Sequence, residues 1–208
     1  FIAPPQDTFG RCNDAGMVTD DFTQGKFILE AVLDNGGEVS DEALRNAFRC
    51  WMDHPFYPNF TGPTTRASMQ RIFNDTRPSL QGDVVESEPK QEVVLINNGN
   101  ASATNGAAMK AWSASLLSLG TPEELIATTY NIAQFTHNNV ISVSGACAIS
   151  TAVNAALSDG ITLEDVMAAA IKGADQGYDY AEQHGAMMMA GPSVARRIEL
   201  AIQIGRMH

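Results

Sequence analysis

The sequence predicts a single all-α domain, and three observations support this prediction. Apolar residues recur at helical spacing, helix start signals precede several of these segments, and the alternating patterns typical of strands are scarce. With 208 residues, of which 44% are hydrophobic and 18% charged, the chain is long enough for one domain with a sizeable core. We therefore treat residues 1–208 as one unit.

Three helices are expected in the N-terminal part of the chain. Apolar residues at helical spacing mark the first over residues 22–33, and Asn35-Gly36-Gly37 ends it. Ser40 is suited to cap the second helix, whose apolar face extends to Trp51. The third is expected over residues 64–73.

Residues 74–103 differ from the segments around them. Pro78, Gly82, Pro89 and Gly99 interrupt a mostly polar stretch with one short apolar run. A segment of this length without clear periodicity is usually functional or mobile. We expect it to form a surface excursion from the domain.

The second half of the chain is expected to consist of closely packed helices, because Ala, Gly and Ser are frequent on their predicted faces. One helix is expected over residues 104–119, with Trp112 and Leu116 among its inward-facing residues. The next begins at Thr121-Pro122-Glu123-Glu124, which combines an N-cap, a proline at the first helical position and a capping box.

The helix that begins at Thr121 is expected to end near residue 135, and three further helices follow it. They are expected over residues 138–157, 162–177 and 194–208. Thr162 and Asp165 repeat the capping pattern at the start of the second of these.

Composition excludes some classes of partner. A net charge of −11 argues against nucleic acid, whose phosphates require a basic face. No apolar run of about 18 residues is present, which argues against a membrane-spanning segment. Cys12, Cys50 and Cys147 are too sparse for a disulfide framework or a zinc site, so we expect a cytoplasmic protein. The sequence does not indicate an oligomeric state.

The strongest local signal is Gly16-Met17-Val18-Thr19-Asp20-Asp21, at the entry to the first expected helix. Two carboxylates and a hydroxyl are hard oxygen donors of the kind that Mg²⁺ or Ca²⁺ prefers. Neighbouring helical side chains diverge, so Asp20 and Asp21 need ligands from elsewhere to complete a site for one ion or two. The same triplet is also a good helix start whose charges favour the helix dipole. Both interpretations stay open from these residues alone.

Two glycine-containing segments and one histidine are further candidates. In the segment 102–110, small residues allow backbone N–H groups to approach a phosphate at a helix N-terminus, with Lys110 nearby. Gly62-Pro63-Thr64-Thr65-Arg66 repeats the pattern of a glycine turn that enters a helix. His137 follows Thr136 at a break between two apolar helices. An ordinary loop, an intramolecular ion pair and a structural histidine explain the same residues without a ligand.

Several catalytic motifs are absent from the sequence. It contains no G-x-S-x-G elbow, no H-E-x-x-H pair, no Walker A loop and no dinucleotide fingerprint. The four histidines, at positions 54, 137, 184 and 208, do not have metal-ligand spacing. Covalent serine or cysteine catalysis therefore has no support.

Taken together and in order, five segments resemble the ADP-ribosylglycohydrolase family, which also includes a lens crystallin. These segments are Thr19-Asp20-Asp21, Gly62-Pro63-Thr64-Thr65-Arg66, Asn105-Gly106-Ala107-Ala108-Met109-Lys110, Thr136-His137 and Gly191-Pro192-Ser193-Val194-Ala195-Arg196-Arg197-Ile198. The resemblance covers essentially the whole chain. It implies an orthogonal bundle of helices with a binuclear magnesium centre at the bottom of a cleft.

The resemblance also implies roles for individual residues. Thr19, Asp20 and Asp21 would be metal ligands, and Asp20 or Asp21 would orient the water that attacks the anomeric carbon. The residues implied to bind the ADP-ribose moiety are Gly62, Ser102, Asn105, Gly106 and His137. The implied activity is magnesium-dependent hydrolysis of a glycosidic bond in an ADP-ribosylated protein or small molecule.

The chain departs from the family pattern at several points. Phe22 stands where the family usually has Thr, and Lys110 replaces an Arg, which gives up planar bidentate donors. The Gly-Asp-x-Asp-Thr motif that supplies the second half of the metal ligands is absent, as is the family's N-terminal Gly-Asp segment. We therefore expect a chain that is incomplete at both ends. Two alternatives follow: a non-catalytic ADP-ribose-binding or structural relative, or a hydrolase of another N-glycoside.

Overall fold

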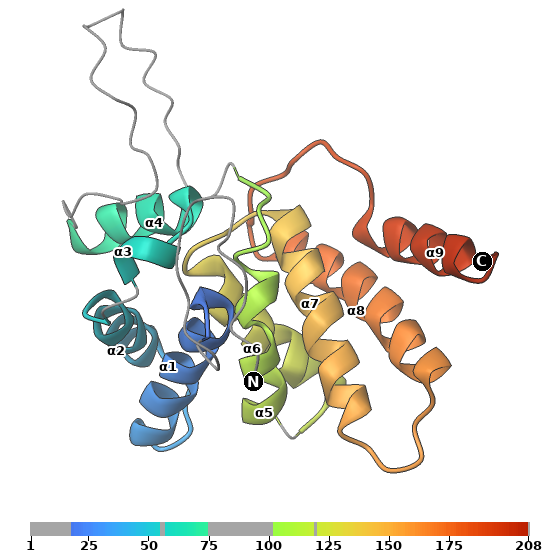
Figure 1. The fold of residues 1–208 in the computed structure, drawn as a ribbon, viewed down its shortest axis with the longest axis horizontal. Coiled ribbons are helices and arrows are strands. Elements are labelled where there is room, and N and C mark those ends of the chain that lie inside the picture. The colour runs from blue at the N-terminus through green and yellow to red at the C-terminus, as the bar shows by residue number, and fades with distance from the viewer. Residues whose placement is uncertain (1–17, 55–56, 75–101, 119, 208) are drawn as a thin grey trace, which may run out of the picture.

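A computed structural model describes residues 18–54, 57–74, 102–118 and 120–207, except the side chains of residues 58 and 59. Within these ranges the chain is helical and has no β-strand beyond an isolated bridge between Asn139 and Met187, so the all-α prediction is confirmed. Most of the predicted surface excursion, residues 75–101, lies outside the described residues. Helices α1 to α4 lie on one side of the domain and α7 to α9 on the other, with α5 and α6 between them (Figure 1).

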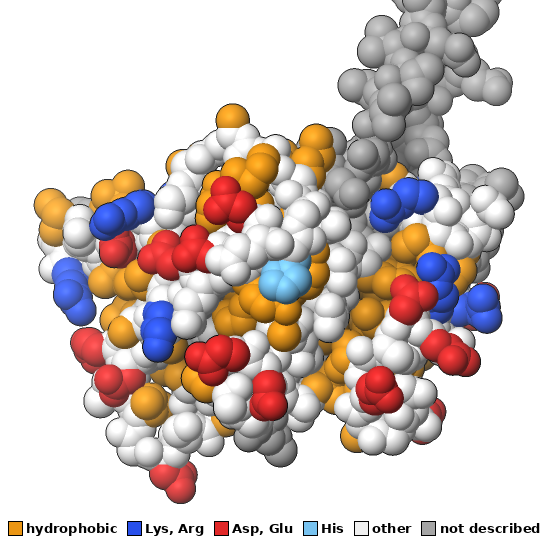
Figure 2. All heavy atoms as spheres, turned by 180° about the vertical axis from the view of Figure 1, so that it is seen from behind, with side chains coloured by type: hydrophobic (Ala, Val, Ile, Leu, Met, Phe, Trp, Pro, Cys, Tyr) orange, Lys and Arg blue, Asp and Glu red, His pale blue; other side chains and the backbone are white. Residues whose placement is uncertain are grey.

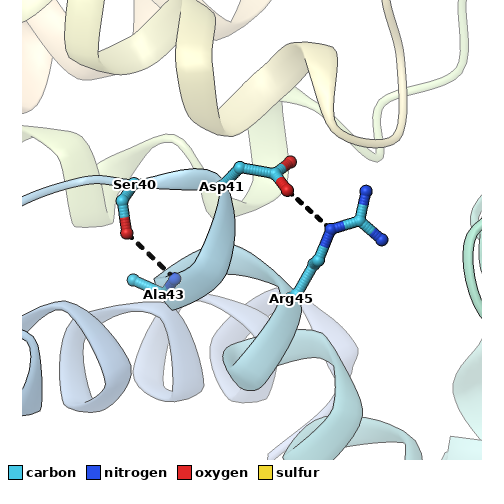
Figure 3. Close-up of polar contacts among 4 residues, drawn as sticks. All are labelled: Ser40, Asp41, Ala43 and Arg45. Atoms are coloured by element: carbon cyan, nitrogen blue, oxygen red, sulfur yellow. Dashed lines mark hydrogen bonds and ion pairs between the residues drawn. The ribbon is translucent and has the colours of Figure 1, made fainter.

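The first two helices, α1 (Asp20–Asp34) and α2 (Asp41–Met52), pack against each other. The predicted cap is confirmed, because Ser40 Oγ accepts a hydrogen bond of 3.1 Å from the backbone N–H of Ala43. Asp41, the residue after Ser40, pairs with Arg45 one helical turn later, with Asp41 Oδ2 at 2.6 Å from Arg45 Nε (Figure 3). Local side-chain chemistry therefore sets where α2 begins.

Large aromatic side chains fill the core between these helices and their neighbours, α3 (Tyr57–Phe60) and α4 (Pro63–Phe73). The indole N–H of buried Trp51 donates to Thr23 Oγ1 at 3.0 Å, which joins α2 to α1. Phe48 stacks on Phe135 with ring centroids 4.9 Å apart. The N-terminal helices are thus held by a few large contacts.

The prediction of a single helix over residues 104–119 is wrong. The chain instead forms a short 3₁₀ helix, η2 (Ala108–Lys110), followed by α5 (Trp112–Leu117). Leu116, expected inside, is 44% exposed, while the serines and the alanine at positions 113–115 are buried. Small side chains face inward because this segment lies directly on α7, where Ser115 Oγ donates to the carbonyl of Ser150 at 2.7 Å.

The following helices begin where the sequence predicts. Helix α6 (Pro122–Gln134) has its capping box, in which Thr121 Oγ1 accepts from the N–H of Glu124 at 3.2 Å. Helix α7 (Val140–Ala156) comes next. The second predicted box, between Thr162 and Asp165, starts α8 (Leu163–Gln183), which continues beyond its expected end.

Helices α7 and α8 form the most extensive helix pair in the described part of the domain. Two glycines of α8 allow this contact, because an ideal Cβ on Gly177 would lie 2.5 Å from Cys147 Cβ and one on Gly173 would lie 2.6 Å from the Cys147 carbonyl. Helix α9 (Val194–Gly205) packs mainly on α8 and begins at Ser193, whose hydroxyl accepts from the N–H of Arg196.

The surface of the described residues carries both acidic and basic side chains. On the face shown in Figure 2, acidic and basic side chains are interspersed and lie over several elements. Among the described residues, every helix is too short or too polar to cross a lipid bilayer.

Candidate active site

The candidate site is a cavity of about 160 Å³ where three segments meet. Its lining includes Asp20 from α1, Gly62 and Thr64 at the start of α4, and Thr104, Asn105 and Gly106 from the loop before η2. The structure therefore brings together four residues predicted separately from the sequence, namely Asp20, Gly62, Asn105 and Gly106.

Larger hollows exist elsewhere on the surface. One of about 680 Å³ lies between α2, α4 and the end of α6, and it contains none of the predicted site residues. Volume alone does not identify a site, because a binding site needs convergent polar groups. We choose the smaller cavity because a carboxylate, hydroxyls and a glycine-rich backbone converge in it.

The Thr19-Asp20-Asp21 triplet lies at the first turn of α1. Thr19 occupies the N-cap position, but its side chain makes no capping hydrogen bond. Its hydroxyl instead donates to Asp21 Oδ2 at 3.0 Å, and Asp21 is exposed outside the cavity lining. Asp20 is the member of the triplet that lines the cavity. Side-chain capping by Thr19 therefore does not explain the triplet, although both carboxylates are placed favourably for the helix dipole.

The triplet fits a hard cation by donor type but not by donor number. Carboxylate and hydroxyl oxygens are the ligands that Mg²⁺ prefers. No group of three or more His, Cys, Asp or Glu side chains that could hold a metal occurs within the described ranges. A complete site therefore needs oxygen ligands in addition to those of Thr19, Asp20 and Asp21.

Ser102 anchors the loop that carries Asn105 and Gly106. Its hydroxyl accepts from Thr64 Oγ1 at 2.9 Å, which ties the loop to α4. Its carbonyl accepts from Asn139 Nδ2 at 3.0 Å, which ties the loop to α7. The side chain of Ser102 is not part of the cavity lining, so the geometry supports a positioning role for this predicted binding residue.

His137 lies behind the cavity wall and is fully buried. Its Nε2 lies 2.8 Å from Thr104 Oγ1, and its Nδ1 lies 2.8 Å from Thr136 Oγ1. Gly106 allows this packing, because a Cβ there would lie 2.6 Å from Cε1 of the His137 ring. As placed, His137 reaches the cavity through Thr104.

Lys110 is fully buried on the inner side of the loop. Its ammonium donates to the Gly106 carbonyl at 2.6 Å and to Thr136 Oγ1 at 2.7 Å, and it lies 5.8 Å from the centre of the Phe48 ring. Burial lowers the pKa of Lys110 to about 7, and the negative charge of Asp20 opposes this shift.

The pKa of His137 is also perturbed. Burial, and secondarily the positive charge of Lys110, lower the pKa of His137 to about 3. The imidazole is therefore neutral at pH 7. In this state one ring nitrogen donates a hydrogen bond and the other accepts one.

Sequence reasoning did not select Thr104 and Thr136 as site residues, although both lie in the segments that it singled out. A hydroxyl directly before Asn105 and another directly before His137 were the available signals. Neither residue type is distinctive, and only the fold brings each hydroxyl to a nitrogen of the same ring.

The fold and this cavity define an all-α protein whose polar site lies at the N-terminus of a helix with two adjacent aspartates in its first turn. A family model described as ADP-ribosylglycohydrolase matches residues 2–206, and the chain belongs to this family. The resemblance stated from the sequence is confirmed. No curated protein and no solved structure matched the chain. Family membership makes the chain a glycosidic hydrolase by class, in a family that acts on ADP-ribosylated substrates and generally uses divalent metal ions.

Proposed function

We propose that this chain binds an ADP-ribosylated protein or small molecule at the cavity and hydrolyses its glycosidic bond in a magnesium-dependent reaction. One observation carries the proposal. Asp20, Gly62, Asn105 and Gly106 come from three separate segments and line the same small cavity.

The start of α4 supports binding of the anionic part of such a substrate. Gly62 is the N-cap of this helix and Pro63 occupies its first turn, so the positive end of the helix dipole lies at the cavity wall. Backbone N–H groups and hydroxyls at a helix N-terminus suit a phosphate. Arg66 does not line the cavity and packs over the Tyr57 ring at 5.1 Å, so we assign it no ligand contact.

Thr19, Asp20 and Asp21 would hold magnesium, as one part of a site for two ions. The metal would supply polarisation of substrate oxygens and a water of lowered pKa. The remaining ligands would have to come from groups other than these three residues.

Asp20 is the better of the two candidate catalytic carboxylates, because it lines the cavity while Asp21 is exposed and bonded to Thr19. Its carboxylate would accept a proton from the attacking water as the water oxygen bonds to the anomeric carbon. The glycosidic bond breaks in the same displacement, and the leaving group takes up a proton from solvent water. Asp21 would assist by holding the Thr19 hydroxyl.

One observation favours a second candidate, a relative that binds ADP-ribose without catalysis. The described residues lack a three-ligand metal group, and hydrolysis in this family generally depends on a divalent cation. Such a protein would keep the binding cavity and lose turnover. Binding and turnover must therefore be measured separately.

The experiment measures ADP-ribose binding by calorimetry and ADP-ribose release from an ADP-ribosylated arginine peptide and an ADP-ribosylated serine peptide, with and without Mg²⁺. We expect binding and Mg²⁺-dependent release, and Asp20→Asn should lower release by about a hundredfold or more. Asp34→Asn, at the far end of α1, is the matched control and should behave as wild type. Binding without release would favour the non-catalytic alternative, and neither binding nor release would overturn both.

We also propose a cytoplasmic location. Cys50 and Cys147 are free thiols in the structure, which suits a reducing compartment. Fractionation of cells that express the chain tests this.

A further inference from the structure

A line of polar contacts runs from the core of the domain to the cavity. It starts at Lys110, whose Nζ lies 2.7 Å from Thr136 Oγ1, continues 2.8 Å to His137 Nδ1, and passes from Nε2 a further 2.8 Å to Thr104 Oγ1. The first three residues are fully buried, whereas Thr104 is exposed and lines the cavity. The function proposed above uses neither Lys110 nor Thr136.

The ammonium group gives this line a direction. Below its pKa of about 7, Lys110 is charged and has donors but no acceptor, so Thr136 Oγ1 accepts from Lys110 in this state. The Thr136 hydroxyl keeps one hydrogen to donate, and His137 Nδ1 is the other partner of this oxygen among the described residues.

Two arrangements of hydrogens are possible for a neutral His137. In the first, Thr136 donates to Nδ1, and Nε2 carries the hydrogen and donates to Thr104. In the second, Nδ1 carries the hydrogen and donates to Thr136, while Thr104 donates to Nε2. The second arrangement leaves the buried hydroxyl hydrogen of Thr136 without an acceptor among the contacts of the described residues, which is unfavourable. In the first arrangement, Lys110 donates to Thr136, Thr136 donates to Nδ1, and Nε2 donates to Thr104, so each buried donor has an acceptor.

The neutral state of His137 supports this choice between tautomers. A protonated ring would donate from both nitrogens and remove the choice. The lowered pKa of His137, about 3, keeps the ring neutral at pH 7.

We propose that Lys110 is a positioning residue which, through Thr136, holds His137 as the Nε2–H tautomer and so turns the hydroxyl hydrogen of Thr104 towards the cavity. Thr104 Oγ1 accepts from His137, so its own hydrogen is the one available to a ligand. The cavity therefore offers a hydroxyl donor at this point to a hydrogen-bond acceptor, such as a phosphoryl oxygen. The ligand part of this inference rests on the proposed function, whereas the tautomer part does not.

Imidazole ¹⁵N NMR of the ligand-free protein at about pH 5.5, where Lys110 is charged and His137 is neutral, tests the tautomer. The His137 signals are assigned by their loss in His137→Gln. We expect an unprotonated Nδ1 and a protonated Nε2 in wild type. In Lys110→Met and in Thr136→Val, this preference should give way to a mixture of both tautomers.

Two controls separate this effect from general disturbance. Lys172→Met removes an exposed lysine of α8 and should leave the His137 spectrum unchanged. Thr104→Val removes the far end of the line and should keep Nδ1 unprotonated, because Thr136 still donates to it. If Lys110→Met does not fold, Thr136→Val decides the result by itself.

A protonated Nδ1 in wild type would overturn the proposal, and so would an unchanged tautomer in both Lys110→Met and Thr136→Val. These outcomes do not depend on ADP-ribose, so they are distinct from a failure of the proposed function. For the ligand part, Thr104→Ser should bind ADP-ribose like wild type, and Thr104→Val should bind about tenfold more weakly. Equal binding by the two variants would overturn the ligand part.

Discussion

The α7–α8 pair and the region around the cavity differ in the kind of polar group that they bury. In the helix pair, serine and threonine hydroxyls bond to nearby carbonyls, as Ser144 Oγ does to the Ala174 carbonyl at 2.8 Å. Around the cavity, the fold buries an ammonium and an imidazole whose pKa values are both strongly lowered. Buried groups with perturbed pKa values are typical of functional sites.

We therefore expect the α7–α8 pair to contribute mainly to stability and the cavity region to contribute mainly to the proposed function. The helix pair is close-packed through glycines and small hydroxyl residues, with no charge in its buried contact. The cavity region retains buried charge at a cost in stability. Substitutions in the first region should change the free energy of unfolding, and those in the second should change pH dependence and ligand binding.

The largest effect is expected in the helix pair. Gly177→Ala would place a methyl group 2.5 Å from Cys147 Cβ, so the helices must separate. We expect a loss of about 2–3 kcal/mol in the free energy of unfolding, measured by urea denaturation. Gly145→Ala in α7 is the matched control, because a Cβ there meets no atom within 4 Å. It should stabilise the protein by up to about 1 kcal/mol, and equal losses in both variants would contradict the close-contact explanation.

The second prediction concerns pH. The pKa of His137 is about 3 in the folded state against 6.5 ordinarily, so the unfolded chain binds more protons between these values. The stability contributed by neutral His137 is present above pH 6.5 and is lost as the pH falls towards 3.

His137→Gln should remove this part of the acid sensitivity, which has a slope of up to about 1.4 kcal/mol per pH unit. Urea denaturation series at several pH values compare the slopes for the variant and wild type. His184→Gln, at an exposed histidine, should keep the wild-type slope. A His137→Gln slope equal to that of wild type would show that the ring is not buried as a neutral group.

The third prediction concerns the loop against His137. Gly106→Ala would bring a methyl group within 2.6 Å of His137 Cε1 and 3.3 Å of Thr65 Oγ1. We expect the loop to move and ADP-ribose binding to weaken by about tenfold, which corresponds to about 1.4 kcal/mol, measured by calorimetry. Gly145→Ala is the control for glycine replacement, because Gly145 does not line the cavity and a Cβ there meets nothing within 4 Å. Similar weakening in both would mean that contact with His137 is not the cause.

The smallest effects are expected at the start of α2, whose polar contacts are shown in Figure 3. Ser40→Ala removes the cap of Ala43 and should cost about 1 kcal/mol of unfolding free energy. Arg45→Ala breaks an exposed ion pair with Asp41 and should cost less than about 0.5 kcal/mol. Thermal denaturation of both variants checks this order, and a larger loss for Arg45→Ala would contradict it.

Most helix starts could be predicted because they depend on residues three positions apart. Ser40, Thr121 and Thr162 each cap the backbone of the third residue after them. The segment 104–119 could not be predicted in the same way. Its apolar spacing suggested one helix, but contact with α7 buries Ser113 and leaves Leu116 at the surface.

The candidate site could be predicted in part. The sequence indicated Asp20, Gly62 and Asn105 by their motifs, and the structure places them around one cavity. It could not indicate that Lys110 is buried, since a lysine is ordinarily exposed. The metal roles of Thr19 and its neighbours stay predictions.

By itself, the sequence determined the all-α class, most helix starts and the family, because these depend on local chemistry and on motifs read along the chain. Only the tertiary structure decided that Asp20 lines the cavity while Asp21 does not, and that a buried lysine reaches it through Thr136, His137 and Thr104. The physical reason is that the Lys110–Thr136 and His137–Thr104 contacts, like the cavity lining, join residues far apart in the chain. Packing in three dimensions sets their distances and their burial.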